Sequence, residues 1–455
     1  MKIAVGLSGG VDSSVAALLL KRQGYDVFAL FMQNWHDTEG TLHGACEWEE
    51  DYQVAQMVAK KIGIPIHFVD LSEEYHKRVV DYMFAEYDKG RTPNPDVLCN
   101  SEIKFDAFIK SAEAYGADVV ATGHYCQKKT ETTPDGQVHR IIAGKDSNKD
   151  QTYFLCQLDQ SQLAKAMFPI GHLTKPEVRK IAKEAGLPSA EKKDSQGICF
   201  VGKVDLPVFL QQQLKAKDGQ VVEIFKDFYD GLDAYPGYGR VDDTDQVIDR
   251  SEELKNIPVK DGDLVIDRNK GNNMSEDKRG FILSNGVWDK LKSMDGEELD
   301  KTLKDITAVY KYKIEDGKII GKHFGAQFFT IGQRKGLNIG GHKESIFVIE
   351  TNIKDNIIYV GEGHKHPGLL RKAVYITSDE IHWIREDLAM EVGESRDYLV
   401  RVRYRQPLQR ATLYRRKDGM YIVFQVHQRG ISAGQFAVWY DENTLEMLGS
   451  GVMSR

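Results

Sequence analysis

Near the start of the chain, glycine and hydroxyl side chains are spaced as in a turn that binds phosphate. The sequence SGGVDSS occupies residues 8–14, between an apolar strand expected at 3–7 and an apolar helix. At such a turn, unpaired backbone N–H groups and the positive end of the helix dipole point toward an anionic ligand. Gly9 and Gly10 would let the backbone approach the phosphate, and the serine hydroxyls would add donors. The pattern favours a phosphate loop over an ordinary glycine-rich turn.

Two cysteines lie in polar segments whose composition is typical of catalytic loops. In TPNPDVLCN, residues 92–100, two prolines stiffen the backbone ahead of a carboxylate, Asp96, and a thiol, Cys99. Cys199 lies in DSQGICF, residues 194–200. From the residues alone, a reactive role for both thiols and a role as small buried hydrophobes are equally open.

The other three cysteines, Cys46, Cys126 and Cys156, are expected to be structural. The chain has five cysteines in all, an odd number that argues against a disulfide framework. It has no CxxC pair, so a zinc or iron–sulfur site has little support. We therefore expect no resident metal site.

The elements that must position these residues alternate between short apolar strands and longer helices. Strands are expected at 2–6, 27–32, 66–70 and 119–122, and helices at 11–22, 47–62 and 75–87. This order is typical of a parallel sheet with helices on both faces. Residues 1–205 are therefore predicted to form a doubly wound α/β domain.

The remainder of the chain has the pattern of β domains. Short alternating strands are expected at 398–404, 411–415, 420–425 and 436–440. They predict a small antiparallel barrel or sandwich over residues 365–455. Residues 317–341 and 345–360 also look β-rich. They place a smaller central β domain at 206–364, interrupted by an extra segment at about 225–313 that is rich in Asp, Lys and Gly.

The charge of the chain excludes a generally basic nucleic-acid binder but permits a local binding face. The 455 residues hold 61 basic and 68 acidic side chains, a net charge of −7. Residues 401–430 depart from this balance, with roughly eight basic side chains against one acidic. Arg401, Arg403 and Arg405 alternate along one expected strand and would share a face. That face is interpreted either as an RNA-binding surface or as a solvated strand face.

Membrane and secretory signals are missing from the sequence as it stands. No apolar run reaches about 18 residues, the length that a membrane-spanning helix needs. The first residues, MKIAVGLSGG, do not have the pattern of a secretory signal. We therefore expect a cytoplasmic protein with no membrane partner.

The phosphate loop lacks the lysine of the Walker A motif and the spacing of a dinucleotide-binding motif. It resembles instead the SGGxDS pyrophosphate loop of the N-type ATP pyrophosphatases. Six segments also resemble, in the same order, those of the tRNA-specific 2-thiouridylase (MnmA) family. They are GLSGGVDSS, TPNPDVLCN followed by Ile103-Lys104-Phe105, ATGHY at 121–125, KDQTYFL at 149–155, DSQGICF, and TIGQRKGL at 330–337.

This resemblance implies an enzyme that adenylates the C2 oxygen of the wobble uridine in the tRNA anticodon loop and then replaces AMP with persulfide sulfur. Cys199 would carry the sulfur, Cys99 would be its partner thiol, and Asp96 would act as a general acid or base. ATP is the expected substrate, with Mg²⁺ bridging its phosphates. The implied partners are tRNA and a sulfur-donor protein. Asp12 would help to hold the metal or the pyrophosphate, with helix capping as the alternative.

The resemblance also implies binding residues on the matching motifs. The expected ATP contacts are Gly6, Leu7, Ser8, Gly9, Gly10, Val11, Asp12, Ser13, Met32 and Gly123. The expected tRNA contacts are Asn94, Pro95, Asp96, His124, Lys149, Asp150, Gln151, Arg403, Tyr404 and Gln435. The segment at about 225–313 is additional to the family pattern and receives no catalytic role; it would serve as a sulfur-donor dock, an oligomer contact or neither.

Two other functions stay open. The same kind of loop occurs in amidotransferases and ligases that use ammonia or an amino acid, for which Cys99 and Cys199 would be dispensable. A non-catalytic RNA-binding protein with a nucleotide-binding fold would release neither AMP nor pyrophosphate.

Overall fold

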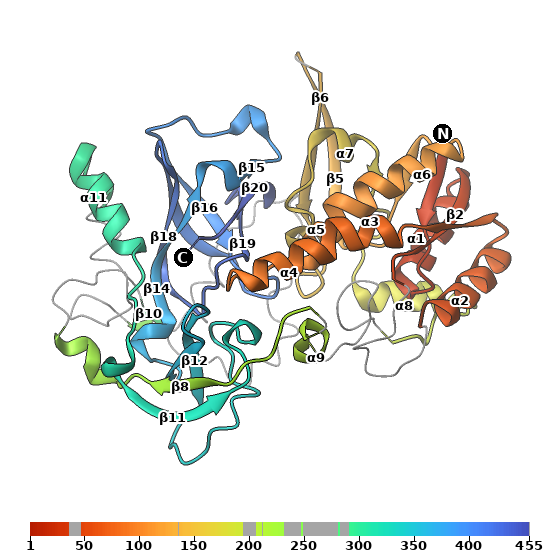
Figure 1. Cartoon of the computed structure of the whole chain (residues 1–455). Coiled ribbons are helices and arrows are strands. Elements are labelled where there is room, and N and C mark those ends of the chain that lie inside the picture. The colour runs from red at the N-terminus through yellow and green to blue at the C-terminus, as the bar shows by residue number, and fades with distance from the viewer. Residues whose placement is uncertain are drawn as a thin grey trace.

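Three parts of the chain are arranged side by side, and Figure 1 shows the α/β part beside two β-rich parts. The computed structural model describes residues 1–35, 47–134, 136–193, 206–211, 213–231, 247–248, 281–282 and 291–454. Cys46, Cys199 and most of residues 225–313 lie outside these ranges. Within them, every helix is too short or too polar to cross a bilayer.

The N-terminal part is built on a parallel sheet with the strand order β3-β2-β1-β4-β7. Its strands are β1 (Lys2–Gly6), β2 (Asp26–Gln33), β3 (Ile66–Asp70), β4 (Val119–Ala121) and β7 (Ala166–Met167). Alternate residues of β1 enter different cores, since Ile3 and Val5 pack on one side of the sheet and Ala4 on the other. Both faces are therefore buried, and the predicted doubly wound fold is confirmed.

Helices close both cores of this sheet. The core of Ile3 and Val5 is covered by α1 (Val11–Arg22) and α2 (Glu47–Ile62), which have the predicted bounds. The opposite face is covered by a helical stretch that is longer than the predicted 75–87. It consists of α3 (Ser72–Tyr75), the π-helical η1 (His76–Val80), α4 (Asp81–Asp88), α5 (Pro95–Leu98), the π-helical η2 (Cys99–Ala107) and α6 (Phe108–Ala114).

A hairpin that the sequence analysis did not predict connects the α/β part to the C-terminal barrel. It consists of β5 (Cys126–Thr133) and β6 (Gly136–Ala143), and it stands upright beside the barrel in Figure 1. β6 pairs with β20 (Glu446–Val452), so the hairpin extends the barrel sheet. The buried carboxylate of Glu446 adds ion pairs to Arg140 of β6 (2.7 Å) and to Arg385 of the barrel part (2.5 Å). Backbone pairing and buried charge thus fix the two parts against each other.

The central part is a four-stranded sheet with the order β11-β8-β13-β12. Its strands are β8 (Gly219–Glu223), β11 (Lys318–His323), β12 (Ile346–Asn352) and β13 (Ile357–Glu362). The prediction of β structure is confirmed at 345–360 but is wrong for most of 317–341, where the strand ends at His323. Gly325, Gly332, Asn338 and Gly341 have positive φ, which turns the backbone instead of extending it.

The C-terminal part is the predicted antiparallel β structure. In addition to β20 it contains β14 (Leu370–Thr377), β15 (Ile381–Trp383), β16 (Ser395–Arg401), β17 (Gln409–Arg415), β18 (Gly419–Arg429) and β19 (Phe436–Tyr440). The prediction that Arg401, Arg403 and Arg405 share one strand face is wrong, because β16 ends at Arg401. Gln406 closes a turn there, since its Oε1 accepts from the N–H of Val402 and its own N–H donates to the carbonyl of Arg403.

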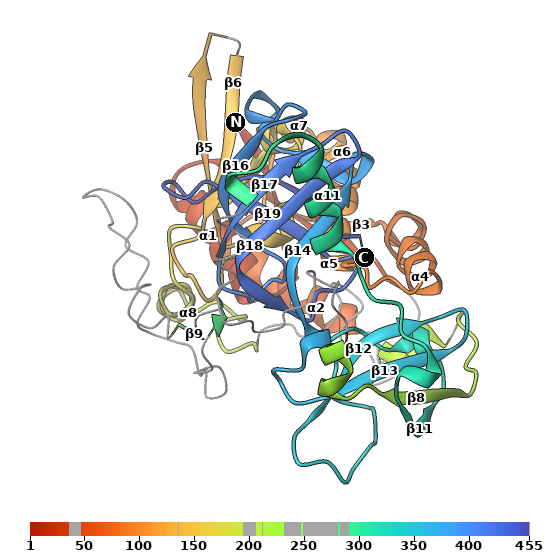
Figure 2. The same ribbon diagram turned by 90° about the vertical axis from the view of Figure 1, so that its left-hand side faces the viewer.

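Part of the additional segment packs on the outside of the barrel. Its described elements are η4 (Lys226–Gly231), β9 (Val247–Ile248), β10 (Phe281–Ile282) and α11 (Gly296–Thr307). Figure 2 shows α11 lying across the barrel strands. Leu299, Leu303 and Ile306 of α11 share a core with Tyr414 and Val423 of the barrel. The helix that makes this contact, α11, carries none of the predicted motifs.

Candidate active site

The phosphate loop begins where β1 ends. The N–H of Leu7 donates to the carbonyl of Leu30 (2.9 Å), which anchors the turn to the sheet. Gly9 has a φ of +74°, and a Cβ there would lie 2.4 Å from the carbonyl oxygen of Asp51, so the position requires glycine. Gly10 is the N-cap of α1, and it contributes no side-chain cap. An anionic ligand at this edge would meet the first N–H groups of α1.

The serine hydroxyls of the turn differ in their roles. Ser8 is exposed, and its N–H donates to the Oγ of Ser13 (3.2 Å). Ser14 is buried, and its Oγ donates to the carbonyl of Gly10 (2.7 Å). The hydroxyl of Ser14 thus stabilises the helix start, and its role as a phosphate donor stays a prediction. Ser13 is buried as well, and its Oγ donates to the same carbonyl (3.2 Å), so Ser8 is the one serine of the three that is exposed.

Three further predicted ATP contacts lie at the same edge of the sheet. Gly6 ends β1, Met32 lies near the end of the neighbouring β2, and Gly123 follows β4 on the other side. A Cβ at Gly123 would lie 2.7 Å from the backbone nitrogen of Ser13, so a side chain there would displace the start of α1. The carboxyl edge of a parallel sheet is where α/β domains bind their ligands.

The carboxylate of Asp12 is held beside the loop by residues from two other segments. Both of its oxygens lie 2.8 Å from the Nζ of Lys175, and Oδ1 also accepts from the Oη of Tyr125 (2.7 Å). Lys175 is the first residue of α8 (Lys175–Glu184) and is only 8% exposed. The alternative that Asp12 caps α1 is wrong, because Gly10 is the N-cap. The ammonium instead balances the carboxylate, so a polyphosphate would not meet an isolated negative charge.

Hydrogen bonds connect the phosphate loop to the other motifs. Tyr125, which contacts Asp12, receives a bond from the N–H of Gln151 at its carbonyl (3.0 Å) and donates its own N–H to the Oε1 of Gln151 (3.0 Å). Farther along the same motif, the carbonyl of Phe154 accepts from the Nδ2 of Asn100 (3.1 Å). Asn100 also donates to the carbonyl of Asp96 (2.9 Å). One hydrogen-bonded network therefore joins the phosphate loop to three predicted motifs, ATGHY, KDQTYFL and TPNPDVLCN.

The segment of Asp96 and Cys99 is a short helix followed by a π-helical turn. The Oδ1 of Asn94 caps α5 by accepting from the N–H of Val97 (3.4 Å), and Pro95 fits the first helical position. Asp96 is half-buried, whereas Cys99 at the start of η2 is 0% exposed. The predicted carboxylate and thiol thus lie on one continuous helical segment. Cys199, the predicted sulfur carrier, lies outside the described residues.

His124 is a buried neutral imidazole. It is 8% exposed, its Nδ1 lies 2.8 Å from the Oγ1 of Thr122, and its ring packs against Phe105 and Phe168. Burial, together with the nearby charge of Lys104, lowers the pKa of His124 well below 6.5. At neutral pH it therefore offers a hydrogen bond and an aromatic face but no positive charge to a ligand.

Changing His124 to glutamine should flatten the acid dependence of stability. Protonation favours the unfolded chain, because the folded pKa lies below the ordinary value of 6.5. The contribution of His124 is therefore complete above that value and is lost as the pH falls below it, at up to about 1.4 kcal/mol per pH unit. Urea unfolding at pH 7 and pH 5 measures this slope. An identical slope in the two proteins would contradict the assignment.

Several predicted tRNA contacts make bonds within the protein. Asp150 is 4% exposed, and it accepts from Arg401 (3.0 Å) and from the hydroxyl of Thr152. The guanidinium of Arg403 donates to the carbonyl of Ile331 (3.2 Å) and to that of Gly430. Four other predicted tRNA contacts are half-buried: Lys149, Gln151, Tyr404 and Gln435. Asp150 and Arg403 thus organise the surface on which these side chains lie.

Cys126 and Cys156 are structural, as predicted. Both are fully buried in the main core. Burial raises the pKa of the Cys126 thiol well above its ordinary value and that of Cys156 to about 12. Neither thiol therefore forms a thiolate readily.

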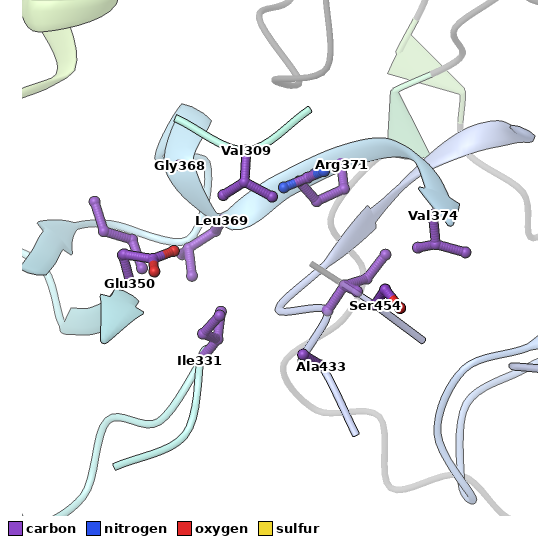
Figure 3. Close-up of a pocket in the computed structure, with 11 residues that line it drawn as sticks. Val309, Ile331, Glu350, Gly368, Leu369, Arg371, Val374, Ala433 and Ser454 are labelled. Atoms are coloured by element: carbon purple, nitrogen blue, oxygen red, sulfur yellow. The ribbon is translucent and has the colours of Figure 1, made fainter. Parts of the chain in front are cut away.

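The described residues hold no group of three or more side chains suited to bind a metal ion. A cavity of about 30 Å³ between the central part and the barrel is lined by residues that include Val309, Glu350, Arg371 and Ala433 (Figure 3). It has room for water but not for a nucleotide. The carboxyl edge of the parallel sheet, at the phosphate loop, stays the predicted ATP site.

Three family models match the chain: "tRNA methyl transferase HUP domain" at residues 1–203, "tRNA methyl transferase PRC-barrel domain" at 303–362, and "Aminomethyltransferase beta-barrel domain" at 374–453. The fold and the phosphate loop define a nucleotide-binding α/β protein joined to two β domains.

Relatives along the whole chain identify the family. A tRNA-specific 2-thiouridylase MnmA of Flavobacterium johnsoniae is 50% identical over 454 residues, 100% of both chains. Those of Christiangramia forsetii and Halalkalibacterium halodurans are 49% and 40% identical, with 100% and 99% of this chain and 100% and 94% of the relative covered. The chain belongs to the tRNA-specific 2-thiouridylase MnmA family.

Solved structures share only part of the fold. An NMN synthetase from Francisella tularensis covers 46% of this chain and 73% of its own, with 18% identity and a TM-score of 0.27. A 4-thiouridine synthetase in complex with RNA and ATP covers 47% and 50%, with 18% identity and a TM-score of 0.28.

Proposed function

We propose that the chain is an ATP-dependent tRNA sulfurtransferase that converts the C2 oxygen of a wobble uridine to sulfur. The observation that carries the proposal is the hydrogen-bonded network from Asp12 through Tyr125 and Gln151 to the segment of Asp96. It connects a loop suited to polyphosphate with a segment suited to base recognition and thiol chemistry. Whole-chain relatives of the same activity support it.

In the first step the α-phosphate of ATP is transferred to the uridine C2 oxygen, and pyrophosphate leaves. The N–H groups at the start of α1 and the loop of Gly9 and Gly10 would hold the pyrophosphate. Mg²⁺ would enter as part of MgATP, held by the phosphates and water, because the only carboxylate of the loop, Asp12, is already paired with Lys175. Asp96 would hold or move a proton at the edge of the base.

In the second step a persulfide on Cys199 supplies the sulfur. Its terminal sulfur attacks C2, the C2–O bond breaks, and AMP leaves. The thiolate of Cys99 then attacks the Sγ of Cys199, which breaks the S–S bond, leaves the sulfur on the uridine and forms a Cys99–Cys199 disulfide. An external thiol reduces the disulfide, and a sulfur-donor protein reloads Cys199. Thiol reductants and ATP are both cytoplasmic, so we place the protein in the cytoplasm.

Reconstitution with unmodified tRNA tests the proposal. The protein is incubated with MgATP, a persulfide donor and tRNA, and the digested tRNA is analysed by mass spectrometry alongside AMP and pyrophosphate release. We expect 2-thiouridine with wild type and none with Cys199→Ser. An amidotransferase or ligase would tolerate Cys199→Ser, and a non-catalytic binder would release no AMP. Either result would overturn the proposal.

A further inference from the structure

The barrel and the central part both contact the catalytic segment, residues 92–100, which carries Asp96 and Cys99. The Nε2 of Gln435 donates to the carbonyls of Thr92 (2.9 Å) and Pro93 (3.1 Å), and its Oε1 accepts from the Nδ2 of Asn94 (3.4 Å). Both donors and the acceptor of this one amide are therefore engaged by three consecutive residues. Asn94 is also the cap of α5, so the contact reaches the helix that carries Asp96.

The backbone around Gln435 is close to the same segment. The N–H of Thr92 donates to the carbonyl of Ala433 (2.7 Å). Gly434 has a φ of +88°, and a Cβ there would lie 3.0 Å from the backbone nitrogen and carbonyl of Thr92. The barrel backbone around Gln435 is itself paired, because the N–H of Met453 donates to the carbonyl of Gln435 (2.8 Å). Thr92 and its neighbours therefore contact a part of the barrel whose backbone is itself hydrogen-bonded.

The central part contacts this junction as well. The hydroxyls of Thr92 and Thr330 lie 3.3 Å apart, and Arg403 donates to the carbonyl of Ile331. Figure 3 shows Ile331 and Ala433 on the wall of one cavity. The motif TIGQRKGL, the barrel turn and the catalytic segment thus meet at one hydrogen-bonded junction.

We infer that Gln435 is a positioning residue that holds the Asn94–Asp96 segment, and through it Cys99, in the arrangement that the reaction requires. Its two N–H donors cannot add a phosphate contact without giving up a bond to the segment, since both are in use. The inference rests on the proposed function for its catalytic consequence. Its structural consequence, a shielded Cys99, can be measured without any activity.

The test is Gln435→Glu, which keeps the shape but replaces the two N–H donors with an oxygen that faces the carbonyls of Thr92 and Pro93. Gln137→Glu on the exposed hairpin β5–β6 is the control for the added charge. The full-length variants are pulsed with N-ethylmaleimide without ATP or tRNA, and labelling of each cysteine is measured by mass spectrometry. We expect labelling of Cys99 to rise about 10-fold in Gln435→Glu and to stay at the wild-type rate in the control.

Cys126 and Cys156 are internal controls in the same experiment, because both are buried and neither belongs to the segment that Gln435 contacts. An equal rise at all three thiols would mean general destabilisation and would overturn the inference. If Gln435→Glu does not fold, Gly434→Ala tests the same contact from the backbone side, with the same expected rise at Cys99 alone.

Kinetics separates positioning from RNA binding. At saturating tRNA, Gln435→Glu should lower kcat at least about 10-fold while the KM for tRNA changes less than about 3-fold. A raised KM with wild-type kcat and wild-type Cys99 labelling would make Gln435 a tRNA contact only and would overturn the inference. If wild type forms no 2-thiouridine, the proposed function fails, but the labelling result still decides whether Gln435 holds the segment.

Discussion

Replacement of Lys175 by methionine should raise the KM for ATP by about 10- to 100-fold. The ammonium contacts both oxygens of Asp12 at 2.8 Å and lies at the starts of two helices that face the ligand edge. Without it the carboxylate is left as an unbalanced charge beside the polyphosphate. Loss of a hydrogen bond to a charged group costs about 1.5–3 kcal/mol, and each 1.4 kcal/mol is a factor of ten.

The measurement is pyrophosphate release as a function of ATP concentration at saturating tRNA. Lys180→Met on the same helix is the matched control, because its side chain is 75% exposed and pairs with Glu184. If Lys175 acts by balancing Asp12, the double variant Asp12→Asn, Lys175→Met should recover part of the lost ATP affinity. Wild-type ATP dependence in Lys175→Met would contradict the assignment.

The α/β part was predictable because its local patterns and its tertiary environment agree. Strands β1, β2 and β4 of the parallel sheet have residues buried in the cores on both faces, so each reads as a short apolar run, and α1 and α2 have the expected bounds. The hairpin β5–β6 was missed because its tip is polar and its partner, β20, lies about 300 residues away in sequence. Pairing at such a separation leaves no local signal in either segment.

The sequence predicts which residues belong to the candidate site but not which residues they contact. Motif resemblance indicates Asp12, Asp150 and Gln435, but only the fold shows that Lys175, Arg401 and the Thr92 backbone are their partners. Lys175 had one local signal, its place after the capping residue Thr174 in TKPE, which marks a helix start. The alternation of Arg401, Arg403 and Arg405 was misleading because a turn closed by a side chain, Gln406, ends the strand.

Cys99→Ser should abolish tRNA thiolation while leaving the adenylation step intact. A serine hydroxyl is not ionised at neutral pH and does not attack the Sγ of a persulfide, so sulfur release from Cys199 stops. The expected fall in 2-thiouridine formation is at least about 10³-fold, the scale on which loss of a nucleophile acts. AMP-modified tRNA, or ATP-dependent pyrophosphate release in a single turnover, should persist, because the phosphate loop lies on separate elements.

Burial sets the condition under which this thiol reacts. Cys99 is 0% exposed, so its thiol reacts only after the residues packed around it open. Trapping the Cys99–Cys199 disulfide by mass spectrometry should therefore require tRNA and ATP as well as persulfide. Cys126→Ala is the matched control, since Cys126 is equally buried and its thiol has a raised pKa. Thiolation at the wild-type rate in Cys99→Ser would remove Cys99 from the reaction and leave it a core residue.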